Sequence, residues 1–95
     1  MIKEKTTIKD KLTTDYYRVL EILYKNQTTI GEKTFSPITQ NEIAEELHLH
    51  KMTINAIFRE LKEDGLVVQE PNRKRTYYLS DDAIDICKRI LRIKI

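Results

Sequence analysis

The spacing of apolar residues predicts a helix over residues 15–26 and a separate arm before it. The apolar stripe of this helix recurs at i, i+3, i+4 and i+7: Tyr16, Val19, Leu20 and Leu23. Thr13 or Thr14 is placed to cap its first turn. Residues 1–12 lack such periodicity, so we expect an N-terminal arm that is flexible or docks late in folding. Residues 27–37 have the composition of a loop, and because this is long for a helix–helix connection, something is expected to be presented or paired there.

Two more helices follow, separated by the short break 48–50. Thr39 and Glu42 form a capping box, S/T-x-x-E, which opens the first of them. The second covers about residues 51–64 and again has apolar residues at i, i+3, i+4 and i+7: Ile54, Ile57, Phe58 and Leu61. Gly65 is placed to end it, because glycine readily adopts the left-handed backbone found after many helices.

Beyond this glycine the pattern changes from helical to strand-like. Segments 66–70 and 75–79 are rich in β-branched and aromatic residues, and 71–74 is turn material between them. Ser80 then caps a last helix, within residues 81–95. The order of elements predicts an α+β, mostly α fold: a winged helix-turn-helix with a three-helix core, a two-stranded wing and a C-terminal helix.

Length and composition favour one intracellular domain. The chain has 95 residues, which is the size of a single compact domain. Its 40% hydrophobic and 34% charged residues exclude a disordered tail and a membrane protein. One cysteine cannot form the internal disulfide bonds that stabilise small secreted domains, and the first residues carry no secretory signal. We therefore expect a cytoplasmic protein that does not bind membranes.

Charge is distributed unevenly along the chain. The net charge is only +2, from 17 basic and 15 acidic residues, which excludes a uniform polycation. Residues 39–47 hold three acids and no base, whereas Arg73, Lys74 and Arg75 form a compact basic cluster. Such a cluster is either a solvated loop or a contact for an anionic partner.

Residues 39–80 carry a combination of short motifs at a spacing that is specific for a fold. The pieces are Glu42-Ile43-Ala44, Leu47-x-Leu49, Thr53-Ile54, Leu61, Gly65-Leu66 and Arg75-x-Tyr77-x-Leu79-Ser80. This pattern resembles the winged helix-turn-helix transcription regulators, the MarR-like and related bacterial groups. The chain departs from that pattern at His48, where such proteins usually carry glycine. We expect a left-handed backbone there, which His tolerates better than most residues.

The resemblance implies a sequence-specific double-stranded DNA-binding protein that regulates transcription. The recognition helix, about 51–64, would enter the major groove, and the wing, 71–75, would lie on phosphates or the minor groove. The predicted DNA-binding residues are His50, Lys51, Met52, Thr53, Asn55, Ala56, Arg59, Arg73, Lys74 and Arg75. Asn55 and Arg59 have the side chains that read adenine and guanine, and Lys51 and Thr53 suit phosphates.

The last helix carries more apolar residues than one small domain needs. One stripe holds Ala83, Ile84, Cys87 and Leu91, and a second holds Ile86, Ile90 and Ile93. The second stripe predicts a homodimer, since a twofold assembly would match a palindromic site. The alternative is that residues 1–12 or the helix 15–26 cover this stripe.

Other function classes find little support in the sequence. Catalytic motifs and cofactor loops are absent, so neither an enzyme nor a cofactor is expected. His48, His50 and Cys87 match no established zinc spacing, and we predict no metal site. Nothing in the sequence identifies a small-molecule effector. Two alternatives to a transcription regulator stay open: a winged helix used as a protein-interaction module, and a plasmid or phage replication or partition accessory.

Overall fold

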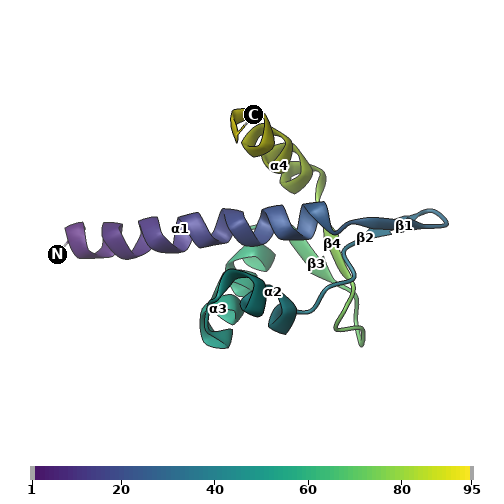
Figure 1. Cartoon of the computed structure of the whole chain (residues 1–95), viewed down its shortest axis with the longest axis horizontal. Helices are drawn as coiled ribbons and strands as arrows, with labels where there is room; N and C mark the ends of the chain where they lie inside the picture. The colour runs from purple at the N-terminus through teal and green to yellow at the C-terminus, as the bar shows by residue number, and fades with distance from the viewer. Residues whose placement is uncertain (1, 95) are drawn as a thin grey trace.

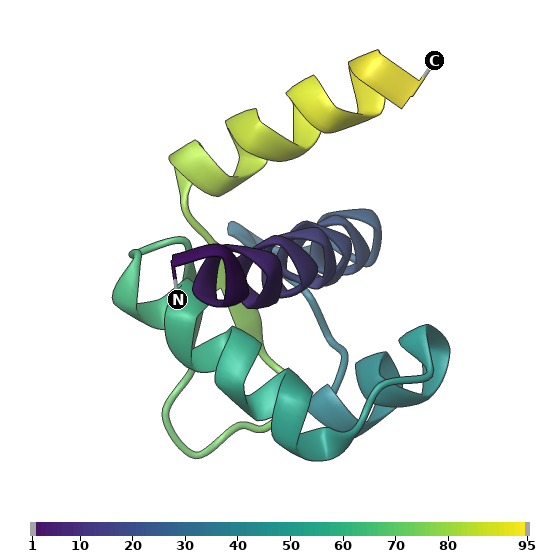
Figure 2. The same cartoon turned by 90° about the vertical axis from the view of Figure 1, so that its left-hand side faces the viewer.

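The computed structural model describes the backbone of residues 2–94 and the side chains of residues 14–92. Its elements, in chain order, are α1 (Ile2–Lys25), β1 (Thr28–Ile30), β2 (Lys33–Phe35), α2 (Gln40–Leu47), α3 (Lys51–Glu63), β3 (Val67–Gln69), β4 (Tyr77–Leu79) and α4 (Asp81–Lys94). Helix α1 runs through the middle of the molecule, with α4 on one side and α2 and α3 on the other (Figures 1 and 2). This arrangement confirms the predicted winged helix-turn-helix. None of the helices, over the described residues, combines the length and hydropathy needed to cross a membrane.

Helix α1 begins much earlier than predicted. We expected an arm over residues 1–12 and a helix from residue 15, but the helix starts at Ile2 and continues without a break to Lys25. Nothing in this stretch interrupts a helix, because it contains neither glycine nor proline. The predicted capping by Thr13 or Thr14 is therefore wrong, since both lie inside the helix.

The predicted loop 27–37 contains a hairpin of its own, in addition to the wing. Strands β1 and β2 pair in antiparallel register, and the hydroxyls of Thr29 and Thr34 lie 2.8 Å apart across the pair. Gly31 occupies the turn with a φ of 66°, a conformation that glycine adopts without strain. The next residue after β2, Ser36, exchanges two backbone hydrogen bonds with Tyr77. Of the two outcomes expected for this segment, presentation or pairing, the structure shows pairing, although its strands were not predicted.

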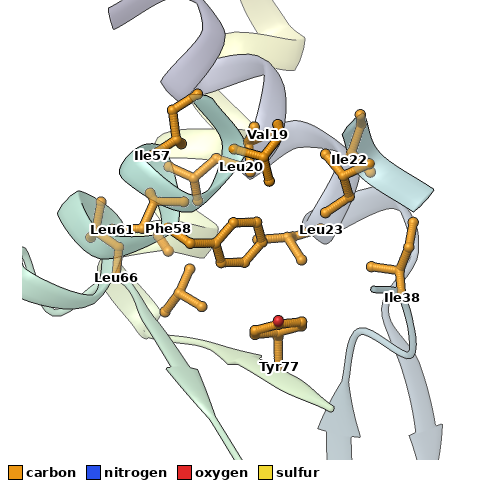
Figure 3. Close-up of a cluster of buried hydrophobic side chains, with 14 of the residues drawn as sticks. Val19, Leu20, Ile22, Leu23, Ile38, Ile57, Phe58, Leu61, Leu66 and Tyr77 are labelled. Atoms are coloured by element: carbon orange, nitrogen blue, oxygen red, sulfur yellow. The ribbon is translucent and has the colours of Figure 1, made fainter. Parts of the chain in front are cut away.

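The core forms where α1, α3 and the wing meet (Figure 3). The four apolar residues predicted to face inward from α3 are all at most 1% exposed: Ile54, Ile57, Phe58 and Leu61. They pack with Val19, Leu20 and Leu23 of α1. The rings of Phe58 and Tyr77 lie 4.9 Å apart, which joins α3 to β4.

The turn between α2 and α3 has the predicted backbone. His48 has φ 56° and ψ 44°, the left-handed conformation, and its N–H donates to the carbonyl oxygens of Ala44 and Glu45. The predicted capping box of α2 is present, because Thr39 and Glu42 each accept a hydrogen bond from the other's backbone N–H. The left-handed residue His48 thus turns the chain from α2 toward α3, while the capping box fixes the start of α2.

The wing has shorter strands and a longer loop than the sequence indicates. Val67–Gln69 pairs with Tyr77–Leu79, and residues 70–76 form the loop between them. After it, α4 packs on the domain through Ala83 and Cys87, both fully buried. The thiol of Cys87 lies 3.6 Å from the carbonyl oxygen of Leu20 and is oriented to donate to it.

Candidate nucleic-acid interface

Helix α3 presents a polar face on the side away from the core. Lys51, Asn55 and Arg59 are exposed, and Met52, at 83%, is the most exposed large apolar residue among the side chains that the structure describes. Thr53 and Ala56 are half-buried beside them. Because every third or fourth residue of α3 is buried, the core contacts one face of the helix, and the opposite face takes no part in the core.

His50 lies at the N-cap position of α3. Its backbone is extended, with φ −69° and ψ 149°, but its side chain makes no capping hydrogen bond. The imidazole is exposed. It therefore lies at the start of α3, where a ligand approaching the free N–H groups of the first turn would meet it.

The loop of the wing reaches toward the same side of the molecule as α3 (Figures 1 and 2). Two backbone hydrogen bonds close it into consecutive turns, from the N–H of Arg73 to the carbonyl of Glu70 and from the N–H of Thr76 to that of Arg73. Both Arg73 and Lys74 are exposed at its tip. The structure thus places two of the three predicted wing cations where an anionic partner can reach them.

The third wing cation, Arg75, has a different position. Its Nη1 donates to Oε1 of Glu42 at 2.8 Å, and its Nη2 donates to the carbonyl oxygen of Pro37 at 3.1 Å. These bonds connect the base of the wing to the start of α2. Arg75 therefore sets the position of the wing relative to the helix-turn-helix, a role that its place in a basic cluster did not indicate.

The carboxylate of Glu42 is the centre of this junction. Its pKa lies below the ordinary value because the backbone N–H and then the hydroxyl of Thr39 donate to it, with the charge of Arg75 adding to the effect. An ionised Glu42 thus holds both the N-terminus of α2 and the wing. Because both groups are largely exposed, the pair positions the wing more than it stabilises the fold.

Two grooves flank β3, where the wing meets the helices. The larger, about 660 Å³, lies between Lys62 and the wing segment 67–74. The smaller, about 350 Å³, is lined by residues of α2, α3 and the wing: Thr39, Gln40, Asn41, Asn55, Gln69, Lys74 and Tyr77. Sequence reasoning did not single out Gln40, Asn41 or Gln69, because only tertiary packing brings them beside Asn55.

The predicted dimer residues on α4 fall into three situations. Ile86 packs against the domain's own core, so this residue is partly used within one copy. Ile90 is half-buried, and the side chain of Ile93 lies outside the described residues. Among the described residues of the predicted stripe, Ile90 is the one that is not packed against the core, and it is therefore the better candidate for a contact with a second copy.

Metal ligands do not gather in the described part of the chain. No group of three His, Cys, Asp or Glu side chains in it is arranged to hold an ion. Cys87 is buried, and burial raises the pKa of its thiol to about 11, with the charge of Glu21 adding to the shift. Such a thiol is a small apolar core group rather than a ligand or nucleophile.

Comparisons with known proteins agree with this architecture. The model of the MarR family matches residues 11–75. The solved structure of a ZitR mutant from Lactococcus lactis, in its apo form, superposes with a TM-score of 0.64 at 18% sequence identity. That superposition covers 98% of this chain and 66% of the ZitR chain, so this chain spans somewhat less than two thirds of its length. A search among curated proteins found no match.

At that level of identity the ZitR structure supports the fold alone, whereas the family match covers most of the chain. The chain belongs to the MarR family, whose members are winged-helix, DNA-binding transcription regulators and not enzymes.

Proposed function

We propose that this protein is a sequence-specific binder of double-stranded DNA that regulates transcription, with α3 in the major groove and the wing on the flanking phosphates or minor groove. The observation that carries the proposal is that α3 and the loop of the wing lie on the same side of α1 (Figure 1), and that both carry exposed polar side chains, with Arg73 and Lys74 on the loop. A helix in the major groove beside a positively charged loop suits duplex DNA.

The residues of this surface divide by the part of DNA they fit. Asn55 and Arg59 offer the groups that pair with adenine and guanine edges, and Met52 and Ala56 offer apolar contacts for thymine methyls. Lys51 and Thr53 lie in the first turn of α3, where they suit phosphates together with His50. The exposed cations Arg73 and Lys74 suit the backbone or minor groove beyond.

Assembly as a homodimer completes the proposal. Helix α4 lies on the opposite side of α1 from α3 (Figures 1 and 2), so self-association through α4 leaves the recognition helix free. Ile90, together with Ile86 and Ile93, supplies the apolar side chains for that contact. A twofold dimer would present two recognition helices to a palindromic site.

The test is selection of bound fragments from random duplex DNA, followed by titration of the selected duplex at two salt concentrations. Enrichment of one sequence, with affinity that falls steeply as salt rises, is expected because phosphate contacts release counterions. If no duplex is retained at low salt while a protein partner is captured tightly, the domain is an interaction module and the proposal is wrong.

A further inference from the structure

A side-chain pair bridges the recognition helix and the wing. Nζ of Lys62, in the last turn of α3, donates to Oε1 of Gln69, in β3, at 3.1 Å. Lys62 lies on the larger of the two grooves beside β3, while Gln69 and Lys74 line both grooves. This pair therefore occupies the notch between the two elements proposed to contact DNA.

The chemistry that this notch offers is mostly hydrogen-bond donation. Since the amide oxygen of Gln69 already accepts from Lys62, the amide offers its two N–H donors to the groove. Two N–H donors remain on the ammonium of Lys62, and Lys74 adds another ammonium. The acid on the groove is Glu70, whose carboxylate accepts from the hydroxyl of Tyr78 at 3.2 Å and lies 3.9 Å from Nζ of Lys33. Donors that converge beside cations fit an anion with several acceptor oxygens.

Duplex geometry supplies that anion at this place. The major groove of B-DNA is about 12 Å wide and the neighbouring minor groove about 6 Å wide, and one sugar–phosphate backbone separates them. A module with α3 in the first groove and its wing in the second must let that backbone cross the notch between them. We infer that Lys62 and Gln69, with Lys74, form a phosphate-binding clamp for this crossing strand. This inference rests on the proposed function.

The hydrogen bond between Lys62 and Gln69 also orients the clamp before its ligand binds. The bond between Lys62 and Gln69 orients both side chains before DNA arrives, so less side-chain entropy is lost on binding. A phosphate contact carries no sequence information, and therefore the clamp sets the register of the wing rather than the choice of bases.

The test compares Lys62→Gln with the wild type on the selected duplex and on an unrelated one. Removing one phosphate contact from each protomer should reduce the magnitude of the slope of log affinity against log salt by about 0.9 per bound protomer, on both duplexes alike. Lys88→Gln is the matched control, because it removes the same charge from an exposed position on α4, away from the notch, and should leave the slope unchanged. Thermal unfolding of each variant checks that the fold is intact.

A second variant separates the clamp from a simple charge effect. Gln69→Leu removes the amide donors without changing the net charge, so it should weaken binding to both duplexes while the salt slope stays near that of the wild type. If Lys62→Gln and Lys88→Gln give equal slopes, or if the Lys62 loss is confined to the preferred sequence, the clamp is wrong while DNA binding by the wild type still stands. If the wild type binds no duplex, the proposed function fails and the clamp fails with it.

Discussion

Helices α3 and α4 are almost equal in length, with 13 and 14 residues, but the domain buries them differently. Helix α3 inserts four large side chains that are at most 1% exposed, whereas the fully buried residues described in α4 are the small Ala83 and Cys87. Larger apolar residues of α4 stay half-buried: Ile84, Ile86, Ile90 and Leu91. The core thus buries the whole apolar face of α3, and its polar face stays exposed to a partner. The apolar face of α4 is buried only in part.

This difference separates two kinds of contact surface. Substitutions on the exposed face of α3 should alter recognition without altering the fold, because no core residue lies there. Substitutions on α4 should affect assembly, since an apolar stripe that one domain does not fully cover favours association.

The largest effect is expected from the core of α3. Phe58→Ala should lower the free energy of unfolding by about 3–5 kcal/mol, because it removes a buried ring that lies 4.9 Å from the ring of Tyr77. Ile90→Ala should lower it by about 1 kcal/mol or less at low protein concentration, since this side chain is half-buried. Urea unfolding measures both values.

Equal losses from these two substitutions would contradict the comparison. A loss for Ile90→Ala that grows with protein concentration would instead sharpen it, because stability that depends on concentration reports association.

The sequence allowed the helix-turn-helix to be predicted closely, because its signals are local. The capping box at Thr39, the left-handed residue His48 and the apolar spacing of α3 each lie within one or two helical turns. These determine most of the face that carries the predicted DNA contacts.

Features formed by distant residues were not predicted. Arg75 and Glu42 are 33 positions apart, and nothing local distinguishes this arginine from its two basic neighbours.

Two local features were also not predicted. The strands β1 and β2 have only three residues each, too short to show an alternating pattern. The early start of α1 was missed because its polar first half was interpreted as an arm, although polar residues such as Lys and Glu form helices well.

The next largest effect concerns assembly through α4. Ile90→Glu should give monomers that remain folded, because a charge placed in an apolar contact opposes association more than it disturbs one domain. Burial of such an aliphatic side chain is worth about 1.5–3 kcal/mol. Sedimentation at micromolar concentration measures the mass, and affinity for a duplex with two half-sites should fall in parallel.

Lys88→Glu is the control for this experiment, since it adds an acid at an exposed position on the same helix and should leave the mass unchanged. A wild-type monomer under these conditions would contradict the dimer and favour the alternative that residues 1–12 cover the stripe.

A comparable effect is expected on recognition, with α3 and the wing behaving differently. Asn55→Ala or Arg59→Ala should cost about 1–3 kcal/mol on the preferred duplex and less on others, since these side chains suit base edges. Arg73→Ala should weaken all duplexes evenly and flatten the salt dependence. Competition titrations with preferred and unrelated duplexes distinguish the two. If both classes of variant lose affinity identically on every sequence, the assignment of α3 as the recognition helix is wrong.

The last prediction tests the buried face of α4 through the pH dependence of stability. Burial raises the pKa of the Cys87 thiol to about 11, whereas an exposed thiol ionises near 8.5. Ionisation therefore favours the unfolded chain first, so the stabilisation from the neutral thiol is complete below about pH 8.5 and is lost as pH rises toward 11. The difference in unfolding free energy between the wild type and Cys87→Ala should shrink over this interval, and using the difference cancels the titration of the tyrosines. A difference that stays constant with pH would mean that the thiol is not sequestered, and that α4 does not pack on α1 through Ala83 and Cys87.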